Sequence, residues 1–287
     1  MKSNLKMYAG LLAAGGMLLF SSCNDEEVQT DELVTAKLTL DEISLTDEAD
    51  AMSEEVLNVV DDIYAANEAS VTGKGYISDF LPDCVTVTTV ETSTSIEKTI
   101  DFGAGCELRG GNVLSGIINL SYAKDMTAAS KTLSITFENF TFNEVAVEGG
   151  KTAMRVRSND NGNPQATVTR DITATWPDGT TAVLGGTKTR EWIEGFGTGF
   201  WGDNVFLITG NWTFTNRNGF TYKKEVLTAL RREWSCRFLV SGVLQITRQD
   251  QSANLDFGDG SCDAFGTLTY PDGTSEEVRL RRFNLDI

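Results

Sequence analysis

From residue 76 onward, the chain is a succession of short β-type segments separated by glycine-containing turns, and this pattern constrains the fold most. The segments are rich in β-branched and aromatic residues, and no helical period interrupts them. We expect strands at 85–90, 96–102, 113–122, 132–142, 145–156, 166–176, 187–194, 204–215, 220–230, 237–247, 264–270 and 278–285. The predicted fold class is mainly β: an antiparallel meander forming a sandwich or open barrel.

An amphipathic helix is expected before the strands, over residues 46–66. Thr46 or Ser44 can cap its first turn, where acidic residues favour the positive end of the helix dipole. Its apolar residues recur at intervals of three and four and make one stripe: Ala49, Met52, Val56, Val59, Val60 and Ile63. Such a stripe is typical of a helix packed on a sheet, and a partner-binding helix is the alternative.

Two similar motifs occur far apart in the chain, D-F-G-A-G-C at 101–106 and D-F-G-D-G-S-C at 256–262. Each ends in a cysteine and has a second cysteine upstream, so the candidate disulfide residues are Cys84, Cys106, Cys236 and Cys262. Local pairing within each hairpin would place the tips near Ser95 and Gln249, both in polar stretches. Each bond would then remove unfolded-chain entropy worth about 3 kcal/mol. Crossed pairing between the halves and free thiols are the alternatives.

The second motif carries a cluster of carboxylates that could bind a metal. Asp256, Asp259 and Asp263 offer oxygen ligands of the kind that Ca²⁺ prefers, and the first motif lacks counterparts of the last two. The other interpretation is a tight turn in which aspartates accept hydrogen bonds from backbone N–H groups. We expect no cofactor, with calcium at these three residues as the alternative.

Residues 192–202 combine aromatic side chains with glycines and must form a loop or a distorted strand. An exposed set of aromatic rings here could stack on sugar rings or on the apolar surface of a partner. Alternatively, Phe196, Phe200 and Trp201 face the core across a bulged hairpin, which we favour. The candidate ligand-binding residues are Trp192, Phe196, Phe200 and Trp201.

The N-terminus predicts export and lipid anchorage. Residues 1–22 have the basic start and short apolar run of a secretory signal, and the segment before Cys23 resembles a lipoprotein signal. We therefore expect Cys23 to be lipidated, residues 23–43 to form an acidic tether, and a single β-rich domain to span 44–287. That domain has possible duplicated halves at about 70–163 and 164–287. An ordinary cleaved signal with an incidental cysteine is the alternative.

Charge and composition exclude several classes of function. The net charge of −17 disfavours nucleic acid and anionic lipid surfaces, which both require clustered Lys or Arg. The chain contains no histidine, which excludes Ser-His and Cys-His nucleophile pairs and every His-liganded metal site. Carboxylate chemistry remains open, for example at Glu191 and Glu194, although no acidic pair stands out and we expect no enzymatic activity.

Several features together resemble an uncharacterised family of Bacteroidetes-type envelope lipoproteins. They are the lipoprotein signal, the acidic cluster 24–27, the two D-F-G motifs with their cysteines, and the Ser-Gly pairs at 115–116 and 241–242. The resemblance implies a β-rich protein anchored in the outer membrane, with the acidic cluster similar to a surface-export signal. It carries no known activity.

These expectations define the functional hypotheses. The first is a non-enzymatic, surface-exposed lipoprotein that binds a ligand or partner, either a glycan or an envelope protein, and no nucleic acid. A structural or assembly subunit similar to fimbrillins is the second, and a lipid carrier with its sheet curved around an acyl chain is a further one. A large apolar cavity would favour the carrier.

Overall fold

The structure is a computed structural model of the chain that describes residues 36–72, 81–125, 127–198 and 200–280. These residues belong to a compact unit, Ala36–Ile287. The predicted signal peptide, the lipidated Cys23 and residues 23–35 of the predicted tether lie outside the described residues.

The unit is built on an antiparallel sheet in which each strand pairs with its neighbours in the sequence, so the predicted mainly β meander is confirmed. The order is β1-β2-β4 and then β5 through β14 in succession, with β3 pairing β4 off this path. The strands are β1 Thr86–Glu91, β2 Ser95–Asp101, β3 Cys106–Glu107, β4 Val113–Ala123, β5 Ser130–Phe142, β6 Val145–Val156, β7 Gln165–Thr175, β8 Thr181–Glu194, β9 Val205–Thr215, β10 Thr221–Glu233, β11 Leu239–Arg248, β12 Gln251–Asp259, β13 Phe265–Thr269 and β14 Ser275–Arg279.

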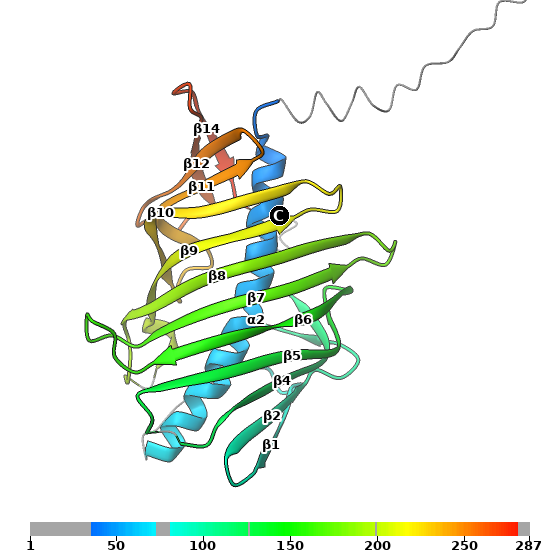
Figure 1. Cartoon of the computed structure of the whole chain (residues 1–287), viewed down its shortest axis with the longest axis vertical. Coiled ribbons are helices and arrows are strands. Elements are labelled where there is room, and N and C mark those ends of the chain that lie inside the picture. Colours follow the sequence, from blue (N-terminus) through cyan, green and yellow to red (C-terminus); the bar gives the residue numbers. More distant parts are fainter. Residues whose placement is uncertain (1–35, 73–80, 126, 199, 281–287) are drawn as a thin grey trace, which may run out of the picture. The chain divides into compact units, whose positions relative to one another are not determined.

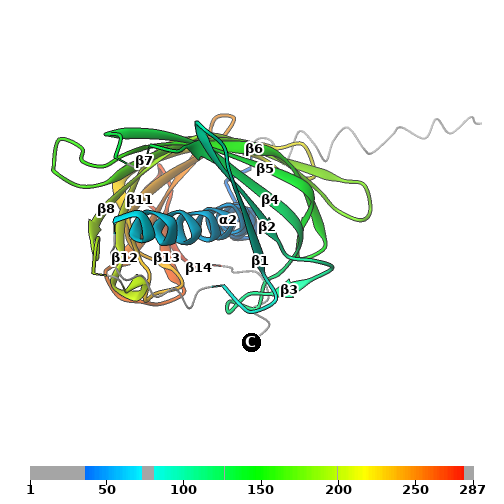
Figure 2. The ribbon, with the colours of Figure 1, turned by 90° about the horizontal axis from the view of Figure 1, so that it is seen from below.

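A long helix, α2 (Leu40–Thr72), lies against the concave face of this sheet and crosses its strands (Figure 1). Viewed along the helix, the sheet curves around α2 and leaves a gap between its first and last strands (Figure 2). Residues from α2 and from both ends of the sheet belong to one buried apolar cluster. The helix and the sheet therefore share a core. In the described part of the chain, no helix is both long and apolar enough to cross a membrane.

The helix begins at Leu40, six residues before the predicted start, because Thr39 and Glu42 form a capping box. The Thr39 hydroxyl accepts a hydrogen bond from the Glu42 backbone N–H at 3.2 Å, and the Glu42 carboxylate accepts one from the Thr39 N–H at 2.8 Å. Leu38 and Ile43, on either side of the cap, are fully buried. Residues 36–43, which we expected to be tether, are thus packed into the unit.

Two faces of α2 are buried, of which the sequence predicted one. The apolar stripe packs as expected, with Met52, Val56 and Val60 at most 5% exposed. Polar residues on another face of the helix are buried as well: Asp47, Ser53, Asn58, Asp61 and Asp62. Because buried charge is costly without a partner, this second face requires a matching surface on the sheet.

The structure pairs each cysteine within its own hairpin, Cys84 with Cys106 and Cys236 with Cys262. Each bond closes the open end of a hairpin, β1–β2 in the first case and β11–β12 in the second. The tips fall at Thr92–Ser95 and near Gln249, as the polar stretches predicted. The two disulfides are confirmed, and the pairing is local.

Each Ser-Gly pair lies in the strand that pairs with a D-F-G strand, β4 in the first case and β11 in the second. Its glycine allows that strand to pack closely against its other neighbour, β5 or β10. Gly116 and Gly242 both have positive φ angles, 75° and 106°, at irregularities in the strand pairing. A Cβ atom would lie 2.1 Å from the Asn139 carbonyl oxygen at Gly116 and 2.4 Å from that of Ala229 at Gly242. Only glycine tolerates both the conformation and the close approach.

Candidate functional site

The concave face of the sheet carries a set of buried basic side chains. In a strand, alternate residues point to one face, so a basic residue at an inward position is carried into the interior. The buried basic residues are Lys98, Lys131, Lys151, Arg170, Lys188, Arg190, Lys224 and Arg248, from strands β2 to β11. Opposite them, α2 carries ten acidic residues and no Lys or Arg. The helix and the sheet are electrostatically complementary.

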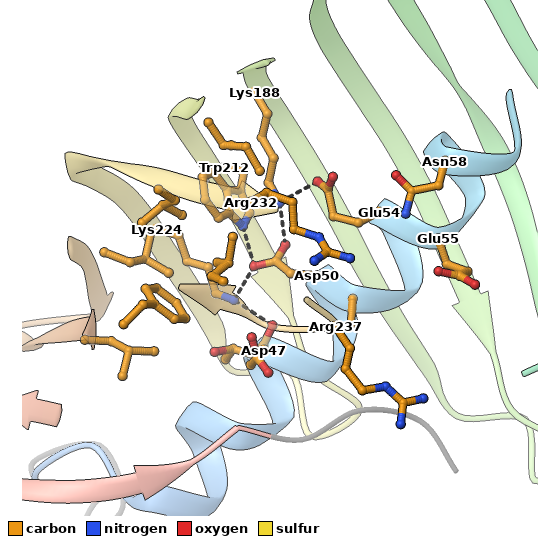
Figure 3. Close-up of a pocket in the computed structure, with 18 of the residues that line it drawn as sticks. Asp47, Asp50, Glu54, Glu55, Asn58, Lys188, Trp212, Lys224, Arg232 and Arg237 are labelled. Atoms are coloured by element: carbon orange, nitrogen blue, oxygen red, sulfur yellow. Dashed lines mark hydrogen bonds and ion pairs between the residues drawn. The ribbon is translucent and has the colours of Figure 1, made fainter. Parts of the chain in front are cut away.

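Asp50 is the centre of this network. Its carboxylate lies 2.7 Å from the Lys224 Nζ, 2.9 Å from an Arg170 Nη and 3.2 Å from the Lys188 Nζ. The Trp212 indole N–H donates a further hydrogen bond at 3.0 Å. One helix carboxylate thus connects strands β7, β8, β9 and β10, and Figure 3 shows several of these contacts.

Other acidic residues continue the pairing along the helix. Near the N-terminus, Glu42 pairs with Arg248 of β11. Glu54 lies 3.2 Å from the Lys188 Nζ, and two turns further Asp61 lies 3.1 Å from an Arg190 Nη. The ion pairs run from β11 toward β6 as the helix proceeds. Because successive acids along the helix pair with bases further along the sheet, this order fixes the position of α2 across it.

The network controls the protonation of its members. Burial alone would raise the pKa of Asp50, but Lys188, Lys224 and Arg170 outweigh it and hold that pKa far below its usual range. The same balance brings the pKa of Glu54 down to about 2. Burial, with the nearby Arg170, lowers the pKa of Lys151 to about 7. The carboxylates are therefore ionised at neutral pH.

A pocket of about 500 Å³ lies beside this network, between the first half of α2 and strands β8 to β12 (Figure 3). Pockets that hold small molecules are generally of this size. Asp47, Asp50, Glu54 and Glu55 line it from the helix. The sheet contributes Trp212 and a group of buried aliphatic and aromatic side chains. The pocket thus combines an apolar wall with a charged one.

The mouth of the pocket, formed by residues 109–112 and 234–237, lies next to the two disulfides. Residue 109 follows Cys106 by three positions, and residue 237 follows Cys236 directly. The exposed Arg237 donates a hydrogen bond to the Gly110 carbonyl oxygen at 3.2 Å, which connects the two loops. Phe257 of the second D-F-G motif lines the pocket from inside. The loops that follow Cys106 and contain Cys236 therefore meet at this end of the pocket.

The aromatic segment lies away from this pocket, and its side chains have different environments. Trp192 is buried against Phe206, so it is not part of an exposed platform. Phe196 and Phe200 are 50% and 62% exposed, so the expectation that they face the core is wrong. The Phe196 ring meets the edge of Trp192 at 5.0 Å. The Trp201 side chain lies outside what the structure describes.

The three aspartates of the second motif each serve a separate turn. Asp256 accepts a hydrogen bond from the Gly258 N–H at 2.9 Å, Asp259 from the Ser261 N–H at 3.2 Å, and Asp263 from the Phe265 N–H at 2.9 Å. Across the described ranges, no group of three or more Cys, Asp or Glu residues is placed to hold a metal ion. The structure does not bring these carboxylates together as a calcium site.

The residues of the pocket and of the ion-pair network were not identified from the sequence. A signal was present in β8, where Leu184, Lys188, Arg190 and Trp192 have the same parity and therefore point to the same face. Basic residues at the same alternate positions as a buried leucine point into the interior, where they require acidic partners. The ten acids of α2 are the second half of that signal.

Comparison with known proteins adds no relative: no protein-family model, no curated protein and no solved structure matches this chain.

Proposed function

We propose that this chain is a lipid-anchored protein of the bacterial outer membrane, facing the cell surface, that binds a ligand without transforming it. The pocket between α2 and strands β8 to β12 is its binding site. The lipid anchor at Cys23 and the surface location rest on the N-terminal sequence, which resembles a lipoprotein signal followed by an acidic export cluster.

The observation that carries the proposal is the pocket itself, about 500 Å³ in volume, which is lined by the hairpin that Cys236–Cys262 closes and by residues that follow Cys106. The cross-links and the ion pairs of Asp50 hold its walls in place, which reduces the entropy lost when a ligand binds. Of the carboxylates that line the pocket, Asp50 and Glu54 are paired with Lys and Arg, whereas general acid-base catalysis is most efficient with a group whose pKa is near neutral pH. Lys151, whose pKa is about 7, donates its hydrogen bond to the Ser53 carbonyl oxygen and does not line the pocket.

The experiment is a ligand screen by melting temperature on the purified protein, with a variant whose pocket is filled. Ala51 lines the pocket from α2 and forms none of the ion pairs, so Ala51→Phe occupies the space and leaves the network intact. Ala129→Phe, at an exposed position before β5, is the matched control. A compound that stabilises the wild type and the control but not Ala51→Phe supports the proposal. If Ala51→Phe responds to every binder as the wild type does, the pocket is not the site.

A second candidate site is the exposed pair Phe196 and Phe200, for which the observation is their exposure on the β8–β9 connection. We propose this pair as a contact for a glycan or an envelope protein, because exposed aromatic rings stack on sugars and on apolar surfaces. Phe200→Ser should abolish binding on a glycan array or in a pull-down and leave the melting temperature within about 1 °C. Unchanged binding by that variant would contradict the assignment.

A further inference from the structure

The lining of the pocket is divided by chemistry. Its sheet wall, from adjoining strands β10 to β12, is a continuous apolar surface made of Leu230, Leu239, Leu244, Ile246, Leu255 and Phe257. Five of these six side chains are buried, and none carries a polar atom. An elongated apolar group lying along this wall would remove its own apolar surface from water, with a gain of about 25 cal/mol for each Å² covered.

Three arginines line the pocket next to this wall: Arg232 pairs across the strands with Leu239, and Arg109 and Arg237 lie on the adjoining loops, where Glu55 approaches Gly110. Arg109 and Arg237 are exposed and belong to the two loops of the mouth. Arg232, at the end of β10, is half-buried and extends among the lining side chains (Figure 3). Guanidinium groups bind carboxylates and phosphates through paired hydrogen bonds. The mouth is thus suited to an anionic group.

The balance of charge around the pocket is positive, although the chain carries −17. The lining includes five basic and four acidic residues. Two of those acids are also paired with arginines outside the lining, Asp50 with Arg170 and Glu54 with Arg190. The low pKa values of Asp50 and Glu54 report the same excess of positive charge. A cationic ligand would add to this excess, and an anionic one offsets it.

We propose that the ligand is an amphipathic anion, an acyl chain that ends in a carboxylate or a phosphate. The chain lies along the apolar wall, and the head group binds Arg232 and Arg237 at the mouth. This inference rests on the proposed function and names the chemical class of its ligand. A free fatty acid and the acyl phosphate portion of a lipid share this chemistry, and the choice between them is an arm of the experiment.

The test compares four probes of equal chain length on the purified protein by equilibrium dialysis: decanoate, decyl phosphate, decanol and decylamine. One of the two anions should bind at one molecule per protein, with a dissociation constant at least tenfold lower than that of decanol or decylamine. Arg237→Gln should weaken anion binding at least fivefold, because it removes the charged contact. The substitution also removes the hydrogen bond to Gly110, so unchanged decanol binding is the check that the apolar wall is intact. Arg279→Gln, an exposed arginine on β14, is the control and should change neither.

The outcomes separate this inference from the proposed function. The assignment of an amphipathic anion as the ligand is wrong if decanol or decylamine binds as tightly as the anions. It is also wrong if the Arg237→Gln variant binds the anions as tightly as the wild type does. In that case the pocket would still be supported as a binding site if the screen finds another compound that binds the wild type but not Ala51→Phe. If neither the four probes nor the wider screen yields a compound sensitive to Ala51→Phe, the proposed function fails, and the ligand class fails with it. Tighter binding of decanoate than of decyl phosphate identifies a free acid, and the reverse identifies a phosphate head group.

Discussion

A single carboxylate, that of Asp50, pairs with basic side chains from three strands on the concave face of the sheet. Taking these charges out of water is costly, and their mutual attraction offsets that cost only while all of them are present. Lys224 is almost fully buried and also donates to the Thr46 carbonyl oxygen, so it cannot turn toward water when the carboxylate is lost. The network is therefore sensitive to the loss of one negative charge.

Asp50→Asn should lower the free energy of unfolding by about 3–5 kcal/mol, because it leaves Lys188, Lys224 and Arg170 without their shared partner. Urea denaturation followed by circular dichroism measures the change. Asp160→Asn, in the exposed loop between β6 and β7, is the matched control and should stay within about 0.5 kcal/mol of the wild type. A loss of less than about 1 kcal/mol in Asp50→Asn would show that the network contributes little to stability.

Glu54 makes the stability of the protein depend on acid pH. Its pKa is about 2 in the folded protein, below the ordinary glutamate value of 4.5, so the folded state favours the ionised form. The stabilisation is complete above pH 4.5, amounts to about 3 kcal/mol, and is lost as the pH falls from 4.5 to 2. Glu54→Gln should therefore be less stable than the wild type at pH 7 and approach it at pH 2.5, as measured by urea denaturation. An unfolding free energy that differs by the same amount at both pH values would contradict this assignment.

At the scale of the elements, the capping box determines where α2 begins. Thr39→Ala removes the side-chain oxygen that accepts the Glu42 N–H and should cost about 1 kcal/mol. Thr39→Ser keeps that oxygen and should cost at most a few tenths of a kcal/mol. Thermal unfolding of the two variants provides the comparison. Equal losses in both variants would mean that the methyl group, and not the cap, accounts for the effect.

The two disulfides close separate hairpins, so their contributions should add. Removing Cys84–Cys106 or Cys236–Cys262 by a double substitution to alanine should lower the free energy of unfolding by about 3 kcal/mol in each case. Removing both bonds should cost close to the sum, because the loops that they close do not overlap. Chemical denaturation of the three variants under oxidising conditions tests this. A large excess in the combined variant would show that the hairpins stabilise each other.

Elements with a strong local pattern were predictable. The β-branched and alternating segments correspond to strands, and the polar stretches near residues 95 and 249 are hairpin tips. Two strands were not separated in advance: β3, which has two residues, and β12, which begins just after the tip near Gln249 and runs into the second D-F-G motif. The helix was predicted too short because its capping box precedes the region where the apolar stripe is clear.

At the scale of the whole unit, the pocket depends on contacts that no local pattern reveals. It forms where the curvature of the sheet brings the β3–β4 loop to the β10–β11 loop, joined by the hydrogen bond from Arg237 to Gly110. The inward basic residues also run against the rule that Lys and Arg face solvent. They become interpretable only when the acidic helix is placed inside the sheet. The hydrophobic pattern of the sequence predicts the core and the meander of strands. The candidate site, in contrast, depends on ion pairs between residues that are far apart in the sequence.

The structure of the protein determined with bound decanoate or decyl phosphate tests the central claim most directly. The alkyl chain should lie between α2 and strands β10 to β12, in contact with Leu244 and Leu255, and the head group should be within hydrogen-bonding distance of Arg232 or Arg237. An anion bound elsewhere, for example against Phe196 and Phe200, with the pocket beside Asp50 empty, would contradict the claim.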